Sequence, residues 1–181
     1  LIMSTILAFA GSNSSTSINH QLVTYLTTQL KDTSFELFKL SDMDLIVYSE
    51  DEQRDNGFPS SINQVYKHIQ AADGLLISVN EHNSNPSAFF KNVLDWLSRL
   101  DRKFLDGKKV FLLSSSTGAR GGMSALEVVE KLIPRFGGEV SFTYSFPSFK
   151  ENFSIEEAKI SNEEIKNEIV AKLHQFEALL K

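Results

Sequence analysis

The stretch TILAFAGSNSSTSIN, residues 5–19, joins an apolar run to a turn made of small polar side chains. Every residue from 6 to 10 is apolar, which is typical of a strand covered on both faces. The next nine residues, 11–19, carry five hydroxyl groups and two amides but no lysine or arginine. A strand, a polar turn and a helix therefore open the chain, and this unit decides the fold.

The same unit recurs along the chain. Five alternations of strand and helix predict an α/β fold with a parallel sheet and helices on both of its faces. No internal repeat or linker interrupts them, so we expect residues 1–181 to form a single domain. The expected strands are residues 4–10, 34–40, 73–79, 108–115 and 139–144, and the expected helices are residues 17–31, 60–71, 86–102, 122–136 and 161–180.

Three helix ends carry explicit signals. Pro86 is expected in the first turn of the third helix, where a missing N–H costs nothing. Gly137 and Gly138 predict a left-handed stop for the fourth helix. Ser161 and Glu164 predict a capping box at the start of the last one.

The composition narrows the possible functions. The chain has 181 residues, 23% of them charged, a net charge of −5 and no cysteine. The lack of cysteine excludes thiol nucleophiles, disulfides and cysteine-bound metals. Nucleic-acid binding is not expected without a basic stripe. Because no apolar run approaches about 20 residues, we expect no membrane span, and without an export signal we expect a cytoplasmic protein.

Ligands of an open parallel sheet bind beyond the carboxyl ends of its strands, where the strand order reverses. The loops that follow the first, third and fourth expected strands are residues 11–19, 80–86 and 115–122, and all are rich in Gly, Ser, Asn or Thr. Each leads into a helix N-terminus, whose free N–H groups suit a phosphate. The first loop therefore predicts phosphate binding by neutral donors, with the alternative that Ser17 only caps its helix.

Other α/β chemistries lack their motifs here. The first loop has no Gly-x-Gly-x-x-Gly, and residues 118–122 lack the Gly-Lys-Ser/Thr of a nucleotide phosphate loop. The sequence around Ser124 fails the nucleophile-elbow pattern, and the four histidines show no metal-ligand spacing. What remains is a planar, phosphate-bearing ligand that spans three neutral loops, and no metal site is expected.

The three loops and the helices after them resemble the NADPH-dependent FMN reductase family of flavodoxin-like flavoproteins. That family has Gly-Ser and Ser-x-Asn around its first loop, Pro-Glu-Tyr-Asn and Lys-Asn-x-x-Asp-Trp around its second, and a Gly-rich third loop before Ala-Leu-Glu. Ser14, Asn80 and His82 depart from the family, which usually has Arg, Pro and Tyr there. The matching segments are Gly11-Ser12, Ser17-Ile18-Asn19, Asn80-Glu81-His82-Asn83, residues 91–96, residues 115–122 and Ala125-Leu126-Glu127.

The resemblance implies a flavodoxin-like three-layer sandwich with sheet order 2-1-3-4-5 and a bound FMN. The first loop is implied to hold the FMN phosphate, the second to run along the flavin ring and ribityl chain, and the third to close over the other ring edge. The implied cofactor-binding residues are, loop by loop, Ser12, Ser14, Ser17, Ile18 and Asn19; Asn80, Glu81, His82 and Asn83; and Ser116, Thr117, Gly118 and Arg120.

The implied activity is that of an FMN-dependent NAD(P)H oxidoreductase. NADPH or NADH delivers hydride to flavin N5, and a small flavin, quinone or azo acceptor then takes the electrons, while no side chain is expected to act as an acid or base. The resemblance also implies a homodimer or homotetramer. Two alternatives stay open, a flavodoxin-like electron carrier that uses protein partners and an FMN-binding sensor without turnover.

Several conspicuous residues have ordinary structural explanations. Trp96 is expected to pack in the core or at a subunit interface, and Lys91 and Asp95 to form a surface pair. The acidic residues 50–52 are expected in a solvated loop. A last aromatic run either folds over the sheet edge of its own chain or meets a second subunit; it comprises Phe142, Tyr144, Phe146, Phe149 and Phe153.

Overall fold

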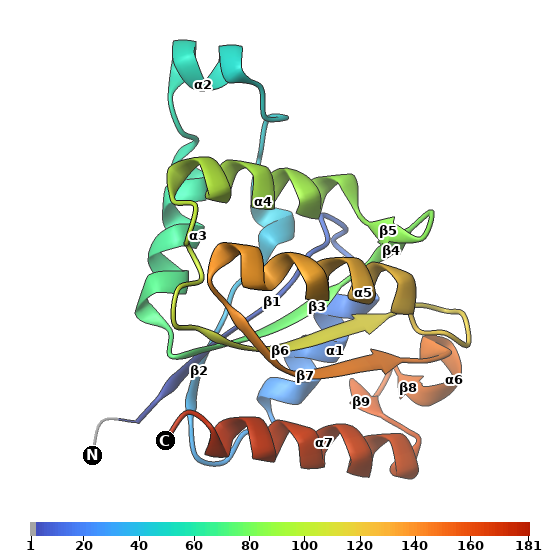
Figure 1. Ribbon diagram of the computed structural model, residues 1–181. Coiled ribbons are helices and arrows are strands. Elements are labelled where there is room, and N and C mark those ends of the chain that lie inside the picture. The colour runs from blue at the N-terminus through green and yellow to red at the C-terminus, as the bar shows by residue number, and fades with distance from the viewer. Residues whose placement is uncertain (1–2) are drawn as a thin grey trace.

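The computed structural model describes residues 3–181 and contains a five-stranded, fully parallel sheet in the order β2-β1-β3-β6-β7 (Figure 1). Counted among the sheet strands alone, this is the expected order 2-1-3-4-5. The order reverses between β1 and β3, so the crevice for a ligand lies beyond their carboxyl ends. The strands are β1 (Thr5–Ala10), β2 (Ser34–Leu37), β3 (Gly74–Val79), β6 (Lys109–Ser115) and β7 (Glu139–Phe146).

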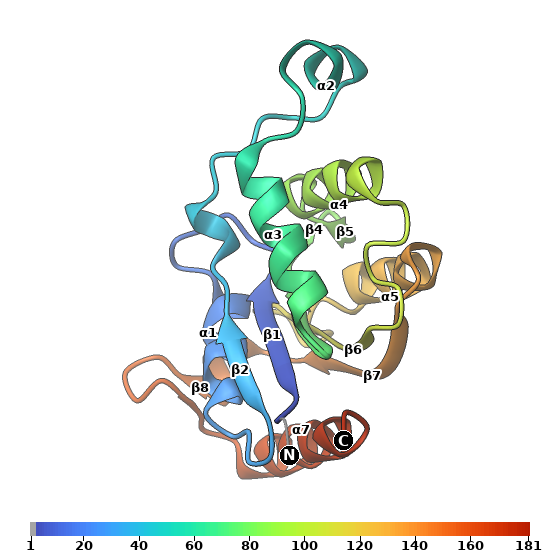
Figure 2. The same cartoon turned by 90° about the vertical axis from the view of Figure 1, so that its left-hand side faces the viewer.

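Helices cover both faces of the sheet, as the sequence predicts (Figures 1 and 2). Strand alternation decides which side chains meet which layer, because successive residues point to opposite faces. Ile6 and Ala8 pack in the core beneath α1 (Ile18–Thr27) and α7 (Glu163–Ala178). Leu7 and Phe9 pack in the core on the other face. That core lies beneath α3 (Ser60–Ala71), α4 (Ala88–Leu100) and α5 (Met123–Leu132).

Two of the expected helix starts are wrong in detail. The N-cap of α4 is Ser87, whose hydroxyl accepts from the N–H of its third residue, so Pro86 precedes the helix. Pro86 instead belongs to a short hairpin of β4 (Glu81–His82) and β5 (Asn85–Pro86). The N-cap of α7 is Asn162 rather than Ser161, because the Asn162 side chain accepts two N–H groups of the first turn.

The aromatic run folds over the edge of its own sheet. β7 continues to Phe146, two residues beyond the expected end, and Phe146 and Phe149 are fully buried. Phe149 stacks on Phe153 at 4.6 Å between ring centroids. This confirms the first of the two interpretations of these residues. The chain after β7 forms α6 (Phe149–Asn152), β8 (Phe153–Ser154) and β9 (Lys159–Ile160).

Residues 50–52 do not lie in a loop, so that prediction is wrong: they begin helix α2 (Glu50–Asn56). The helix follows the turn η1 (Leu40–Asp42) and an extended connection, and Ser49 caps it by accepting from the Glu52 N–H. Figure 2 shows α2 standing beyond the layer of α3 and α4. A second turn, η2 (Ile133–Phe136), ends at Gly137 with φ of 94°, which confirms the left-handed stop after α5. Within residues 3–181, no helix has both the length and the apolarity that crossing a membrane requires.

Candidate functional site

A cleft of about 320 Å³ opens beyond the carboxyl ends of β1, β3 and β6. Its volume lies in the range of small-molecule sites. Hydroxyl and amide side chains dominate its walls, and no lysine or arginine lines it among the described residues. The lining residues are Ser12, Ser14, Thr16, Ser17, Ile18 and Asn19 from the first loop and α1, Asn80, Glu81 and His82 from the second loop, and Ser115, Ser116 and Thr117 from the third.

The three loops that the sequence singled out thus meet in one cleft. Three of the expected cofactor-binding residues, Asn83, Gly118 and Arg120, do not line it. Two lining residues, Thr16 and Ser115, were missing from the expected set. Both lie in the polar loops 11–19 and 115–122, but composition does not show which way a side chain points from a loop or from a strand end.

The N-terminus of α1 offers two free N–H groups to the cleft. Ser17 caps the helix, because its Oγ accepts from the His20 N–H at 3.2 Å and its carbonyl from Gln21 at 3.1 Å. No acceptor in residues 3–181 takes the N–H of Ile18 or of Asn19. Capping and anion binding are therefore compatible here, since they use different N–H groups of the same turn.

Asn19 ties the helix to the sheet with its side chain. The residue is only 2% exposed. Its Oδ1 accepts from Ser78 Oγ at 2.7 Å, and its Nδ2 donates to the Ser115 carbonyl at 3.1 Å. Both polar atoms of the carboxamide are thus engaged within the protein. Asn19 can therefore meet a ligand through its backbone N–H, while its side chain holds β3 and β6 at the correct distance from α1.

Two buried polar atoms in the cleft have no partner. Among the buried side-chain nitrogen and oxygen atoms of residues 3–181, only Asn80 Oδ1, Ser115 Oγ and Glu177 Oε2 lack a hydrogen bond, and the first two belong to residues that line the cleft. A buried polar atom left unsatisfied costs about 1–3 kcal/mol. Asn80 Oδ1 can only accept, whereas the Ser115 hydroxyl can donate or accept. A ligand with hydroxyl groups fits this pair.

Glu81 holds the second loop against the third. Its Oε2 accepts from the Ala125 N–H at 3.0 Å, in the first turn of α5. The N-cap of that helix is Gly122, which has no side chain to cap it. A carboxylate from another loop therefore supplies the missing cap, which also suits the positive end of the helix dipole. The Glu81 side chain is committed to this contact.

The hairpin between β4 and β5 turns at Asn83 and Ser84, whose φ angles are 52° and 61°. A two-residue hairpin turn favours two successive positive φ values, and Asn tolerates them well. Asn83 therefore serves the turn, outside the cleft. Next to it, the Asn80 Nδ2 lies 3.3 Å from the His82 Nε2 at the cleft wall.

The third loop approaches β7 closely. Gly121 has φ of 59°, and a Cβ there would lie 2.6 Å from the Phe146 carbonyl carbon. Ser114 Oγ donates to the Gly121 carbonyl at 2.8 Å and fixes the loop from below. Arg120 is exposed, and its carbonyl accepts from Ser145. The backbone of this loop is therefore held by several contacts, whereas the exposed Arg120 is not among the residues that line the cleft.

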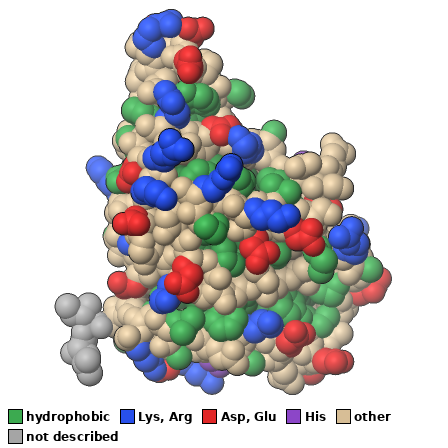
Figure 3. Space-filling model, in the orientation of Figure 1, with side chains coloured by type: hydrophobic (Ala, Val, Ile, Leu, Met, Phe, Trp, Pro, Cys, Tyr) green, Lys and Arg blue, Asp and Glu red, His purple; other side chains and the backbone are tan. Residues whose placement is uncertain are grey.

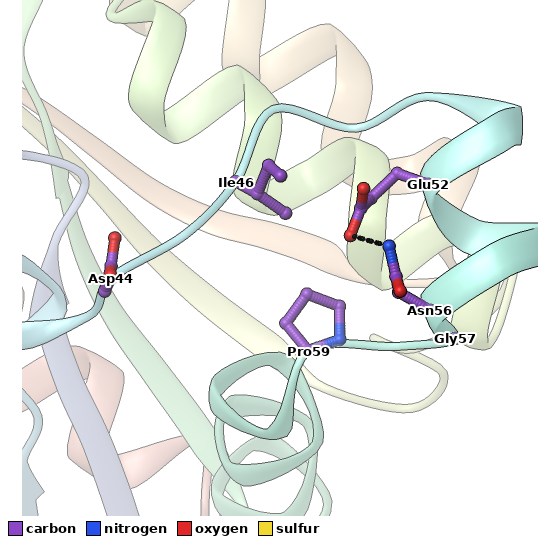
Figure 4. A pocket seen from close by; sticks show the side chains of 6 residues that line it. All are labelled: Asp44, Ile46, Glu52, Asn56, Gly57 and Pro59. Atoms are coloured by element: carbon purple, nitrogen blue, oxygen red, sulfur yellow. Dashed lines mark hydrogen bonds between the residues drawn. The ribbon is translucent and has the colours of Figure 1, made fainter.

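A second hollow, of about 510 Å³, lies under α2 (Figure 4). Among the side chains that line this hollow there is one hydrogen bond, from Asn56 Nδ2 to Glu52 Oε1 at 2.9 Å. It shares no lining residue with the cleft and shows no convergent chemistry. Residues 3–181 contain no grouping of three His, Asp or Glu side chains suited to a metal ion. The cleft at the strand ends remains the candidate site.

The fold and the cleft place the chain among open-sheet proteins that bind a ligand at the topological switch point. The chain belongs to the NADPH-dependent FMN reductase family, whose sequence model matches residues 4–146.

Among curated relatives, a quinone reductase of Escherichia coli (strain K12) is 39% identical over 79 residues, which are 44% of this chain and 42% of that protein. A 2-hydroxy-1,4-benzoquinone reductase of Burkholderia sp is 34% identical over 113 residues, covering 61% of this chain and 60% of the relative. The chain thus spans less than two thirds of the length of each of these relatives.

Solved structures share the fold over nearly the whole chain. FerB, a flavoenzyme NAD(P)H:(acceptor) oxidoreductase from Paracoccus denitrificans, superposes with a TM-score of 0.83 at 21% identity and covers 98% of this chain and 97% of its own. An FMN-dependent NADH-azoreductase from Bacillus anthracis str. Ames Ancestor, in complex with FMN, superposes with a TM-score of 0.61 at 12% identity. This likeness covers 98% of this chain and 99% of the azoreductase chain. At these identities the likeness concerns the fold.

Proposed function

We propose that this protein is an FMN-dependent NAD(P)H oxidoreductase that reduces a small flavin, quinone or azo acceptor. One observation carries the proposal: free helix N–H groups and two unpartnered buried polar atoms share one cleft, without lysine or arginine among its described lining residues, at the switch point of the sheet. The family to which the chain belongs and the names of its relatives support the choice of cofactor and of acceptor class.

The cleft residues fit the phosphate end of FMN. The N–H groups of Ile18 and Asn19 would donate to the phosphate, with the positive end of α1 behind them. Ser12 and Ser14 add hydroxyl donors; the Ser12 Oγ already accepts from the Ser14 N–H at 3.2 Å, which leaves its own proton free for a ligand. Ser14 replaces the usual arginine of the family, so the phosphate is held without a cation.

The ribityl chain follows the phosphate in FMN and would cross the floor of the cleft. Its hydroxyl groups can donate to Asn80 Oδ1 and can pair with Ser115 Oγ, the two atoms that lack partners. Glu81 and Asn19 act indirectly, since their side chains hold α5 and the strands in place. Asn83, Gly118 and Arg120 stay predictions as cofactor-binding residues.

Bound FMN supplies the redox chemistry, because the flavin can take two electrons as hydride from NAD(P)H and pass them on. The side chains described here bind and orient the cofactor, and we assign none of them a role as acid or base. The homodimer or homotetramer implied by the family resemblance is likewise proposed for this chain.

The test is whether the purified protein is yellow and bleaches on anaerobic addition of NADPH or NADH. We expect released FMN, bleaching by one or both nucleotides, and recolouring when a quinone or an azo dye is added. Retained colour with FMN bound would identify an electron carrier or a sensor instead. A protein that binds no FMN would refute the proposal as a whole.

A further inference from the structure

A hollow of about 710 Å³, which we call the basic hollow, lies between the end of α4 and the turn η2. It shares no lining residue with the cleft. Because α4 leads into β6, the hollow lies near the amino end of that strand, whereas the cleft lies at its carboxyl end, about 20 Å away for a strand of seven residues. Figure 3 shows Lys and Arg side chains gathered on the face below α2. The basic hollow is lined by Ser98, Arg99, Arg102, Lys103, Arg135 and Phe136.

Four of these six residues are cations, although the whole chain has a net charge of −5. Within residues 3–181, none of the four forms an ion pair with a carboxylate. The adjacent Asp101 is engaged by the Tyr66 hydroxyl and the Lys103 N–H. Earlier in α4, Lys91 and Asp95 form the exposed ion pair that the sequence predicts. Four clustered cations without ion pairs favour an anion that comes from outside the chain.

The end of a helix explains only part of this cluster. Cations are stabilised near a helix C-terminus, and this accounts for Arg99 and for the residues that directly follow α4. Arg135 belongs to η2, more than thirty residues further along the chain. Lys103 Nζ donates to the Arg135 carbonyl at 3.4 Å, so it links the two elements. The cations of the basic hollow therefore converge from separate parts of the fold.

Arg99 is held in a fixed orientation. Its Nε donates to Gln53 Oε1 at 3.1 Å, and its guanidinium carbon lies 5.8 Å from the centroid of the Tyr48 ring. Tyr48 packs edge-on against Trp96, which is fully buried, as the sequence led us to expect. No acceptor among residues 3–181 takes the two terminal nitrogens of Arg99. A guanidinium positioned in this way presents a planar pair of donors, which suits the oxygens of a phosphate.

The size and the lining of the basic hollow indicate a ligand with several phosphate groups. Its volume lies in the range of small-molecule sites. A single phosphate would leave part of the charge of four cations unmatched. Phe136 is half-buried and packs against Phe104 with 4.8 Å between the ring centroids, so it adds an aromatic wall on which the base of a nucleotide can stack.

The surroundings favour a small ligand over a nucleic acid or an anionic membrane. Helix α2 borders the basic hollow through Gln53. It carries four carboxylates against one guanidinium, Arg54, which pairs with Asp51 and Asp55. A long polyanion or a charged lipid surface would meet these carboxylates beside the hollow, where like charges repel each other. A ligand that fits within the hollow avoids them.

We propose that the basic hollow binds a small ligand with two or more phosphate groups, either a nucleoside polyphosphate or an inorganic polyphosphate. Arg99 supplies the oriented donor pair, and Arg102 and Arg135 contact the phosphate groups from the two sides of the hollow. The ionic contacts are exposed, so salt weakens them. The site is separate from the cleft, and its binding does not depend on the redox activity proposed above.

The test titrates the protein by calorimetry with inorganic tripolyphosphate and with ATP, in magnesium-free buffer and with or without saturating FMN. We expect one site per chain, the same affinity with and without FMN, and an affinity that falls as the salt concentration rises. Arg102→Ala with Arg135→Ala removes two cations and should weaken the binding of both probes about tenfold or more. Tighter binding of ATP would identify a nucleotide as the ligand, and binding of tripolyphosphate at least as tight would identify inorganic polyphosphate.

Both substituted arginines are exposed, so circular dichroism and the thermal midpoint should stay near those of the wild type. Lys150→Ala with Lys159→Ala removes the same charge at exposed positions elsewhere and should leave the affinity for tripolyphosphate unchanged. A wild type that binds neither probe overturns the proposal. So does an equal loss of affinity in the two double variants, full affinity in the variant of the hollow, or displacement of FMN by tripolyphosphate.

Discussion

Replacing Ser115 by alanine should move stability and affinity in opposite directions. The Ser115 hydroxyl is 2% exposed and has no partner in the protein, so the folded apoprotein carries its desolvation cost. Removing the hydroxyl should raise the free energy of unfolding of the apoprotein by up to about 1 kcal/mol. The same change removes one hydrogen bond to FMN and should raise its Kd about threefold to tenfold.

The neighbouring Ser114 provides a matched control. Its hydroxyl is fully buried but donates to the Gly121 carbonyl at 2.8 Å, so it is already satisfied. Ser114→Ala should lower the free energy of unfolding by about 1–2 kcal/mol, because it leaves that carbonyl unpaired. Denaturant unfolding of the apoproteins and fluorescence titrations with FMN measure both quantities. A less stable Ser115→Ala protein with unchanged affinity for FMN would refute the reasoning.

Three further changes test contacts that stabilise the folded chain. Asn19→Ala leaves the Ser78 hydroxyl and the Ser115 carbonyl unpaired in the core, and should lower the free energy of unfolding by about 2–4 kcal/mol in denaturant titrations. Glu177 accepts three hydrogen bonds from the turn before β2 through one buried oxygen, so Glu177→Ala should cost about 3 kcal/mol; an unchanged urea midpoint would contradict this. Burial lowers the pKa of His20 below its ordinary value of 6.5, so the unfolded chain takes up its proton first and stability falls as pH drops below that value. His20→Gln should make the urea midpoint depend less on pH across this range. An equally steep dependence in the variant would assign the loss of stability at low pH to other groups.

The sheet and the position of the cleft were predictable because they follow from patterns that extend over many residues. The apolar run of residues 6–10 and its four counterparts gave the strands and, with the resemblance, their order. The polar loops predicted the position of the cleft, because the loops that follow parallel strands meet at the carboxyl edge of the sheet. Features that depend on single hydrogen bonds were harder to predict. For example, Asn162 rather than Ser161 caps α7, because local geometry decides which of two suitable capping residues is used.

Helix α2 and the buried side-chain atoms without partners could not be predicted for a different reason. α2 has no apolar stripe, because it buries nothing within its own chain, so hydrophobic periodicity gives no signal for it. Ser115 ends an apolar strand, and its lack of a partner depends on Asn19 engaging the Ser115 carbonyl rather than the hydroxyl. Glu81 lines the cleft, but the sequence did not show that its side chain also caps α5 across 44 residues of sequence.

The ratio of the affinities for FMN and riboflavin tests the central claim most directly, since the two ligands differ only by the phosphate. We expect the apoprotein to bind FMN about tenfold to hundredfold more tightly than riboflavin. Ile18→Pro removes one of the two free N–H groups at a helix position that tolerates proline, and should shrink this ratio without adding or removing charge. Equal affinities for the two ligands, or a ratio that Ile18→Pro leaves unchanged, would contradict phosphate binding by the backbone of α1.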